Sequence, residues 1–168
     1  MKYAIVYSSQ TGNTKMLAEK VKNILPDGEC IYFGSPDIAA LEAERIYLGF
    51  WTDRGSCDGQ TADFLKKLTS QELFLFGTAG FGENQEYFDT VVEHSCKNMP
   101  KGVKLIGSFM CQGKMPMEVR HRYEKMQAGA VIAPNVQGMI DNFDKALSHP
   151  DACDLDALCL AVRQHMPI

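Results

Sequence analysis

Short apolar runs alternate with segments in which apolar residues recur every three or four positions. In one such segment Leu17, Val21 and Leu25 share a helical face. The run at 73–76, Leu-Phe-Leu-Phe, is apolar on both faces, as expected at the centre of a parallel sheet. The alternation predicts an α/β fold: a doubly wound sheet of five parallel strands with helices on both faces. The strands are expected at 3–7, 30–33, 46–51, 73–76 and 103–111.

The C-terminal third contains two segments with apolar residues at helical spacing, which predicts one helix in addition to the closing helix. The closing helix is expected to place Leu155, Leu158 and Val162 on one face, with Asp151 or Asp154 as its cap. Another periodic segment runs from 136 to 147. We therefore predict a single domain over residues 1–168, with 112–150 as an extra helical segment before the final helix.

Three glycine-bearing loops follow the first, third and fourth predicted strands. In doubly wound sheets ligands bind beyond the carboxyl ends of the strands, where strand order reverses. The first loop, residues 8–14, joins a strand to a helix and is rich in hydroxyls, with Gly12 allowing close backbone approach. Unpaired N–H groups and a helix dipole suit such a loop to a phosphate. Because the loop contains no Lys or Arg, neutral donors would hold the anion.

Two common phosphate motifs do not fit. The Gly-Lys-Ser/Thr ending of a Walker loop is absent, and Gly80-x-Gly82 is followed by Gln85 where the dinucleotide fingerprint needs a third glycine. The remaining pattern, Ser9-Gln10-Thr11-Gly12-Asn13-Thr14, resembles the phosphate-binding loop of flavodoxins. An ordinary strand-to-helix turn, with Thr and Asn as caps, is the alternative.

The resemblance implies the flavodoxin-like strand order 2-1-3-4-5 and FMN as cofactor. Trp51 is expected to stack on the flavin ring, with packing at the end of a core strand as the alternative. The family's tyrosine position is held by Gln85 here, so Phe81 is the nearest second aromatic, unless it folds onto the core. We expect no metal and assign no catalytic residue. The expected cofactor-binding residues are Ser9, Gln10, Thr11, Gly12, Asn13, Thr14, Trp51, Thr52, Asp53, Gly55, Thr78, Ala79, Gly80, Phe81 and Gly82.

Segment 112–150 departs from the flavodoxin pattern, in which the fifth strand leads almost directly to the last helix. Its first part carries the cations Lys114, Arg120, Arg122 and Lys125 among several methionines. One interpretation is a wall beside the flavin that offers positive charge and polarizable contacts to a partner or an anionic substrate. The other is a solvated helix with a few core methionines.

Composition narrows the possible partners. Seventeen basic and twenty-one acidic residues give a net charge of −4, which offers no electrostatic support for nucleic-acid binding. The start of the chain does not resemble a leader and no apolar span reaches membrane length, so we expect a cytoplasmic protein without membrane association. The six cysteines form no Cys-x-x-Cys pair, and only Cys57 and Cys111 are expected near the site.

Two functions are consistent with these features, and the oligomeric state is left open. The first is a low-potential FMN electron carrier, or accessory redox subunit, between a flavin or iron–sulfur reductase and an acceptor enzyme. The low potential is expected because an incompletely neutralised phosphate disfavours adding negative charge to the ring. The second is a small FMN-dependent NAD(P)H:quinone or flavin reductase. A phosphoryl-accepting domain is disfavoured because Ser8-Ser9-Gln10 replaces the acidic residues needed for Mg²⁺.

Overall fold

The computed structural model describes residues 1–82, 84–129 and 135–167. Residues 130–134, inside the predicted 112–150 segment, lie outside the described residues. Among the described residues no helix combines the length and apolar character needed to cross a bilayer.

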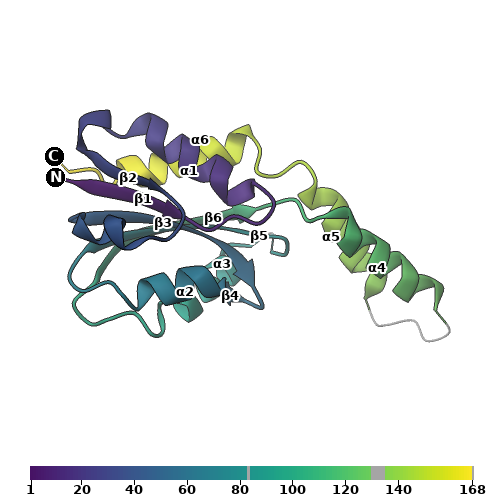
Figure 1. Cartoon of the computed structure of the whole chain (residues 1–168). Coiled ribbons are helices and arrows are strands. Elements are labelled where there is room, and N and C mark those ends of the chain that lie inside the picture. Colours follow the sequence, from purple (N-terminus) through teal and green to yellow (C-terminus); the bar gives the residue numbers. More distant parts are fainter. Residues whose placement is uncertain (83, 130–134, 168) are drawn as a thin grey trace.

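Five long parallel strands form the sheet, in the spatial order β2-β1-β3-β5-β6 (Figure 1). The short strand β4 pairs antiparallel with β3, so the described sheet has six strands where five were predicted. When β4 is left out, the order of the long strands is 2-1-3-4-5, and the predicted fold class is confirmed. The strands are β1 (Tyr3–Tyr7), β2 (Cys30–Gly34), β3 (Arg45–Asp53), β4 (Ser56–Cys57), β5 (Glu72–Ala79) and β6 (Lys104–Gln112).

Helices cover both faces of the sheet (Figure 1). On one face α1 and α6 pack against Tyr47, Phe74 and Phe76. On the other, α2 and α3 cover a cluster that contains Leu48 and Leu75. The elements are α1 (Asn13–Ile24), α2 (Gly59–Leu65), α3 (Gln85–Cys96), α4 (Met117–Ala128), α5 (Val136–Ala146) and α6 (Ala152–Arg163), with 3₁₀ turns η1 (Asp27–Glu29) and η2 (Ile38–Glu42).

Strands β3 and β5 extend further than the apolar pattern indicates. Gly77 and Thr78, expected in a loop, pair with Phe50 and Trp51 of β3, and β5 also pairs with β6 to its last residue. Backbone pairing on both sides therefore carries β5 through Ala79. The Phe50 ring fills the space beside Gly77, where a Cβ would lie 2.5 Å from it.

Helices α4 and α5 project away from the sheet beyond the end of β6 (Figure 1). They pack on each other around Tyr123, Val136, Ile140 and Phe143, a cluster separate from the two that sandwich the sheet. Hydrogen bonds to the Gly80 carbonyl from Gln112 on β6 and Asn142 on α5 tie this pair to the loop after β5.

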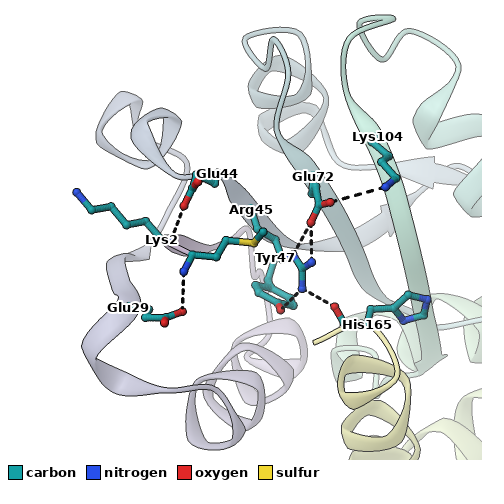
Figure 2. A network of polar contacts seen from close by, with 9 residues as sticks. Lys2, Glu29, Glu44, Arg45, Tyr47, Glu72, Lys104 and His165 are labelled. Atoms are coloured by element: carbon teal, nitrogen blue, oxygen red, sulfur yellow. Dashed lines mark hydrogen bonds and ion pairs between the residues drawn. The ribbon is translucent and has the colours of Figure 1, made fainter. Parts of the chain in front are cut away.

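A polar network closes the opposite end of the sheet, where the parallel strands begin (Figure 2). The buried Arg45 guanidinium donates to Glu72 Oε2 from Nε at 2.9 Å and from Nη2 at 2.6 Å. It also donates to the His165 carbonyl, which fixes the chain after α6. Arg45 thereby links β3, β5 and the C-terminal segment.

Candidate functional site

A cleft of about 580 Å³ lies at the carboxyl ends of β1, β3 and β5, a size typical of small-molecule sites. Of the fifteen residues expected at the cofactor, only Gly12 and Gly82 are not part of its lining, so thirteen come together there. A somewhat larger hollow, of about 650 Å³, lies between α3, the end of β6 and α6 and contains only Gly82 of that set. The fold thus brings the three predicted loops to one cleft.

The loop after β1 presents backbone donors to this cleft. Gly12 is the N-cap residue of α1 and adopts φ +91°, a conformation that favours glycine. Because it has no side chain, it makes no side-chain hydrogen bond to the first turn of α1. The Ser9 Oγ accepts the N–H groups of Gly12 and Lys15, each at 3.2 Å. The N–H groups of Asn13 and Thr14 have no partner among the described residues. The start of α1 therefore retains free donors at its positive end.

Threonines in the first turn of α1 and near the ends of β3 and β5 join the three segments that form the cleft. Thr14, buried, donates its hydroxyl to the Phe50 carbonyl at 3.0 Å and lies 3.2 Å from the Thr78 hydroxyl. Thr52 donates to the Thr78 carbonyl at 2.8 Å. The Thr14 hydroxyl, which the sequence suggested as a phosphate donor, is thus used to fix the loop. Its backbone N–H is the group left for a ligand.

Three aromatic side chains line the cleft. Trp51 is half-buried at the end of β3, and Phe81 is 41% exposed in the loop after β5. Tyr87, which sequence reasoning did not include, lies in the first turn of α3, its ring against Gly82, where a Cβ would lie 2.3 Å from Cδ1.

The glycines of these loops differ in their freedom. The Gly80 carbonyl accepts hydrogen bonds from Gln112 and Asn142, and Met115 packs where its Cβ would be. Gly55 has no neighbour at its Cβ position and, with Arg54, forms a two-residue hairpin between β3 and β4 at φ +79° and +52°. The backbone of Gly80 is therefore held in place by its neighbours, whereas the space beside Gly55, where a Cβ would lie, is empty.

Segment 113–123 forms the facing wall of the cleft. Asn13 Nδ2 donates to the Lys114 carbonyl at 2.8 Å, and the Gly113 N–H donates to Ala79 at 3.0 Å. Val119, Arg122 and Tyr123 on α4 also line the cleft. Part of this segment thus lines the cleft, as the first of the two interpretations expected, and its role toward a partner or substrate stays a prediction.

The thiols near the cleft are shielded. Cys57 and Cys111 are buried, neither lines the cleft, and all six cysteines are free thiols. Burial raises the pKa of both thiols, and it raises the pKa of Cys96 to about 11. These groups are protonated near neutral pH, which makes them poor nucleophiles.

One group of potential metal ligands occurs among the described residues: His149, Asp151 and Asp154. Asp151 and Asp154 form the reciprocal capping box of α6, and His149 Nδ1 lies 2.6 Å from Asp154 Oδ2. This arrangement satisfies the start of the helix and gives these side chains a structural role.

The chain belongs to the flavodoxin family, because the family model for the flavodoxin domain matches residues 4–163. It is 44% identical over 174 residues to a flavodoxin-like domain-containing protein, BilS, of Clostridium symbiosum (strain WAL-14163), covering 94% of this chain and 92% of the relative. A protein of the same description from Clostridioides difficile (strain CD3) is 30% identical over 158 residues, with coverages of 90% and 88%.

The fold is also similar to that of solved flavoproteins. A flavoprotein in complex with FMN from Lactobacillus acidophilus NCFM superposes with a TM-score of 0.50 at 18% identity, covering 65% of this chain and 92% of its own. At this identity the likeness concerns the fold alone.

Proposed function

We propose that the protein binds FMN in this cleft and passes electrons at low potential to a partner reductase. The observation that carries the proposal is the start of α1, where the N–H groups of Asn13 and Thr14 have no partner among the described residues and face a cleft that also contains Trp51. Free donors at the positive end of a helix suit a phosphate, and an aromatic side chain suits a flat ring. The FMN-bound relative in fold supports the choice of cofactor.

A buried acceptor supports the fit to a ligand. Asn13 is 6% exposed, its Nδ2 donates to Lys114, and its Oδ1 is buried without a partner among the described residues. Because a buried polar atom without a hydrogen bond is costly, a donor supplied by a ligand stabilises this arrangement. FMN has hydroxyls on its ribityl chain, and one of these would supply the missing donor to Asn13 Oδ1.

Each part of the cleft has a role in this proposal. The backbone of 9–14 and the exposed Thr11 hydroxyl hold the phosphate, and Trp51 together with Tyr87 or Phe81 contacts the ring. Asp53 and Gly55 also line the cleft and would bond the polar edge of the ring. When bound, the flavin supplies one- and two-electron redox chemistry. The protein binds and orients it, and the aromatic side chains exclude water from its faces.

Charged groups in the cleft raise or lower the reduction potential of the bound flavin. The phosphate loop, residues 8–14, contains no charged side chain, so much of the phosphate charge stays near the ring and disfavours reduction. Lys114 and Arg122 on the facing wall act in the opposite direction. The potential is therefore set by the balance between an uncompensated phosphate and two exposed cations.

The experiment is FMN loading, gel filtration and stepwise anaerobic reduction followed by absorbance. We expect FMN to be retained and to be reduced in two resolved one-electron steps, as an electron carrier requires. Retained FMN that is reduced in a single two-electron step, together with NAD(P)H-dependent turnover of a quinone, would instead establish the reductase. A protein that retains no FMN would refute both functions.

A matched pair of variants tests the phosphate loop. Thr11→Ala removes an exposed hydroxyl at the cleft without breaking a described contact, and Thr69→Ala does the same at the other end of the sheet. One lost hydrogen bond to a charged group weakens FMN binding roughly 10- to 100-fold. We expect this loss for Thr11→Ala and none for Thr69→Ala.

A further inference from the structure

The facing wall of the cleft is held in place by contacts to the predicted phosphate loop and to the loop after β5. Asn13, the first residue of α1, bonds the Lys114 carbonyl, and Gly113 bonds Ala79. Met115 packs on Gly80, where an added Cβ would lie 2.5 Å from its sulfur. The backbone of Lys114 is thereby fixed beside the start of α1, although its side chain is exposed.

Two arginines of α4 have different surroundings. Arg120 is bound to Asp144 at 2.9 Å and to Glu124, so its charge is neutralised within the α4–α5 pair. Arg122 is two positions further along, lines the cleft and has no ion pair among the described residues. Helical spacing places it next to Val119, three positions earlier, which also lines the cleft.

The charge of the cleft lining is opposite in sign to that of the chain. Its described residues include three cations, Arg54, Lys114 and Arg122, and one carboxylate, Asp53, whereas the whole chain has a net charge of −4. Arg54 and Asp53 are exposed and lie 3.8 Å apart, so they largely offset each other. The remaining positive charge belongs to Lys114 and Arg122.

From this arrangement we infer that, besides the partner reductase, a small anionic molecule exchanges electrons with the cofactor, and that its negative group binds at the wall that carries Lys114 and Arg122. This inference rests on the proposed FMN binding. The start of α1 would hold the phosphate; the backbone of Lys114 adjoins it, whereas Arg122 lies on α4. Cations that line a cleft concentrate anions there and raise their association rate.

The test uses two one-electron acceptors of opposite charge. FMN-loaded protein, reduced beforehand with dithionite and freed of excess reductant, is mixed with hexacyanoferrate(III) or hexaammineruthenium(III) in a stopped-flow instrument. Each metal centre gains one electron from the reduced flavin and goes from the +3 to the +2 state, so two acceptors are consumed for each flavin that carries two electrons. The measured quantity is the ratio of the anionic to the cationic acceptor's rate constant.

In the double variant Lys114→Gln/Arg122→Gln we expect this ratio to fall about tenfold at low salt, with the difference shrinking near 1 M salt, where the Debye length is only about 3 Å. Lys101→Gln removes one cation just before β6, at the opposite end of the sheet, and should leave the ratio unchanged. A ratio that is the same in the double variant and in this control would overturn the inference.

A second experiment distinguishes a discrete anion-binding site from a general electrostatic attraction by the positive charge of the cleft. Citrate, which is not reduced here, is titrated at constant ionic strength against the hexacyanoferrate(III) reaction. Saturable inhibition that disappears in the double variant supports a small-molecule site. No inhibition would overturn that site and would fit an acidic protein surface instead. Absorbance of the loaded protein is recorded first, because loss of FMN would refute the proposed function, whereas retained FMN with unchanged rates refutes this inference alone.

Discussion

The two walls of the cleft are built in different ways. The first consists of loops that end β1, β3 and β5, so each is anchored to a central parallel strand and linked to its neighbour through Thr14, Thr52 and Thr78. The second is α4, whose core is a small cluster shared with α5 and separate from the sheet. The first wall is therefore stabilised with the fold as a whole. The second is joined to it through residues 113–115, but its helix α4 packs in a cluster of its own and brings charge.

The largest expected effect is on the second wall. Phe143 is fully buried in the α4–α5 cluster, and Phe143→Ala leaves a cavity that costs about 3–5 kcal/mol. Because that cluster is separate, we expect fast amide hydrogen exchange in α4 and α5 with little change in β3 and β5.

Leu147→Ala serves as the control for this variant, since Leu147 is 47% exposed at the end of the same helix pair. It should change exchange in α4 little. If Phe143→Ala instead accelerates exchange in the central strands to the same extent, the two walls are one cooperative unit and the comparison fails.

A smaller effect is expected when the first wall is disturbed. A Cβ on Gly49 would lie 2.4 Å from the Phe76 ring and 2.9 Å from Thr14 Cγ2. Gly49→Ala should therefore lower the free energy of unfolding by about 1–3 kcal/mol and weaken FMN binding by moving Thr14. Gly28→Ala, with nothing within 4 Å, is the matched control. Equal denaturation midpoints for the two variants would contradict this account.

The links between the loops predict a further loss. Thr14→Val keeps the shape of the side chain and removes the buried hydroxyl that bonds Phe50 and Thr78, at a cost of about 1–3 kcal/mol. Chemical denaturation measures this cost. The FMN dissociation constant should rise as well, and an unchanged constant would show that the loops hold their positions without this bond.

The smallest effect concerns the end of the sheet away from both walls. The hydrogen bond from Arg45 holds the pKa of the Glu72 carboxyl below its ordinary value, and burial opposes this shift. Since the folded pKa is the lower one, ionised Glu72 stabilises the protein above the unfolded pKa, and this stability is lost as pH falls through the folded pKa.

Glu72→Gln should therefore cost about 1 kcal/mol at pH 7 and flatten the acid side of the stability profile between about pH 5 and 3. Thermal unfolding across that range measures it. FMN affinity should not change, because Glu72 lies at the other end of β5 from the cleft. If the variant loses stability between about pH 5 and 3 as steeply as the original protein does, Glu72 is excluded as the cause of that loss.

The sequence was sufficient for the fold and the first wall because both depend on local patterns. Apolar runs identified the long strands, and the hydroxyl-rich loop with Gly12 stands directly between a strand and a helix. The two-residue strand β4 was missed because Ser56 and Cys57 are too few to show a period. Tyr87 was missed because it belongs to a helix and reaches the cleft only through its packing on Gly82.

The second wall was suggested by its cations and methionines as one of two interpretations, but its contacts were beyond local patterns. The contact between Asn13 and Lys114 joins residues 101 positions apart, and nothing near either residue signals it. Spacing alone also does not separate Arg120, which is neutralised by Asp144, from Arg122, which lines the cleft. The first depends on how the chain after β6 meets α1 and the second on where α5 packs, and both are determined by tertiary contacts.

The most direct test of the central claim compares FMN with riboflavin, which lacks only the phosphate. Isothermal titration of the purified protein with each flavin measures the difference that the loop 9–14 is proposed to create. Several hydrogen bonds from backbone and hydroxyl donors to one phosphate predict FMN binding at least about 100-fold tighter than riboflavin. Equal affinities would show that the loop does not hold a phosphate and would contradict the proposal.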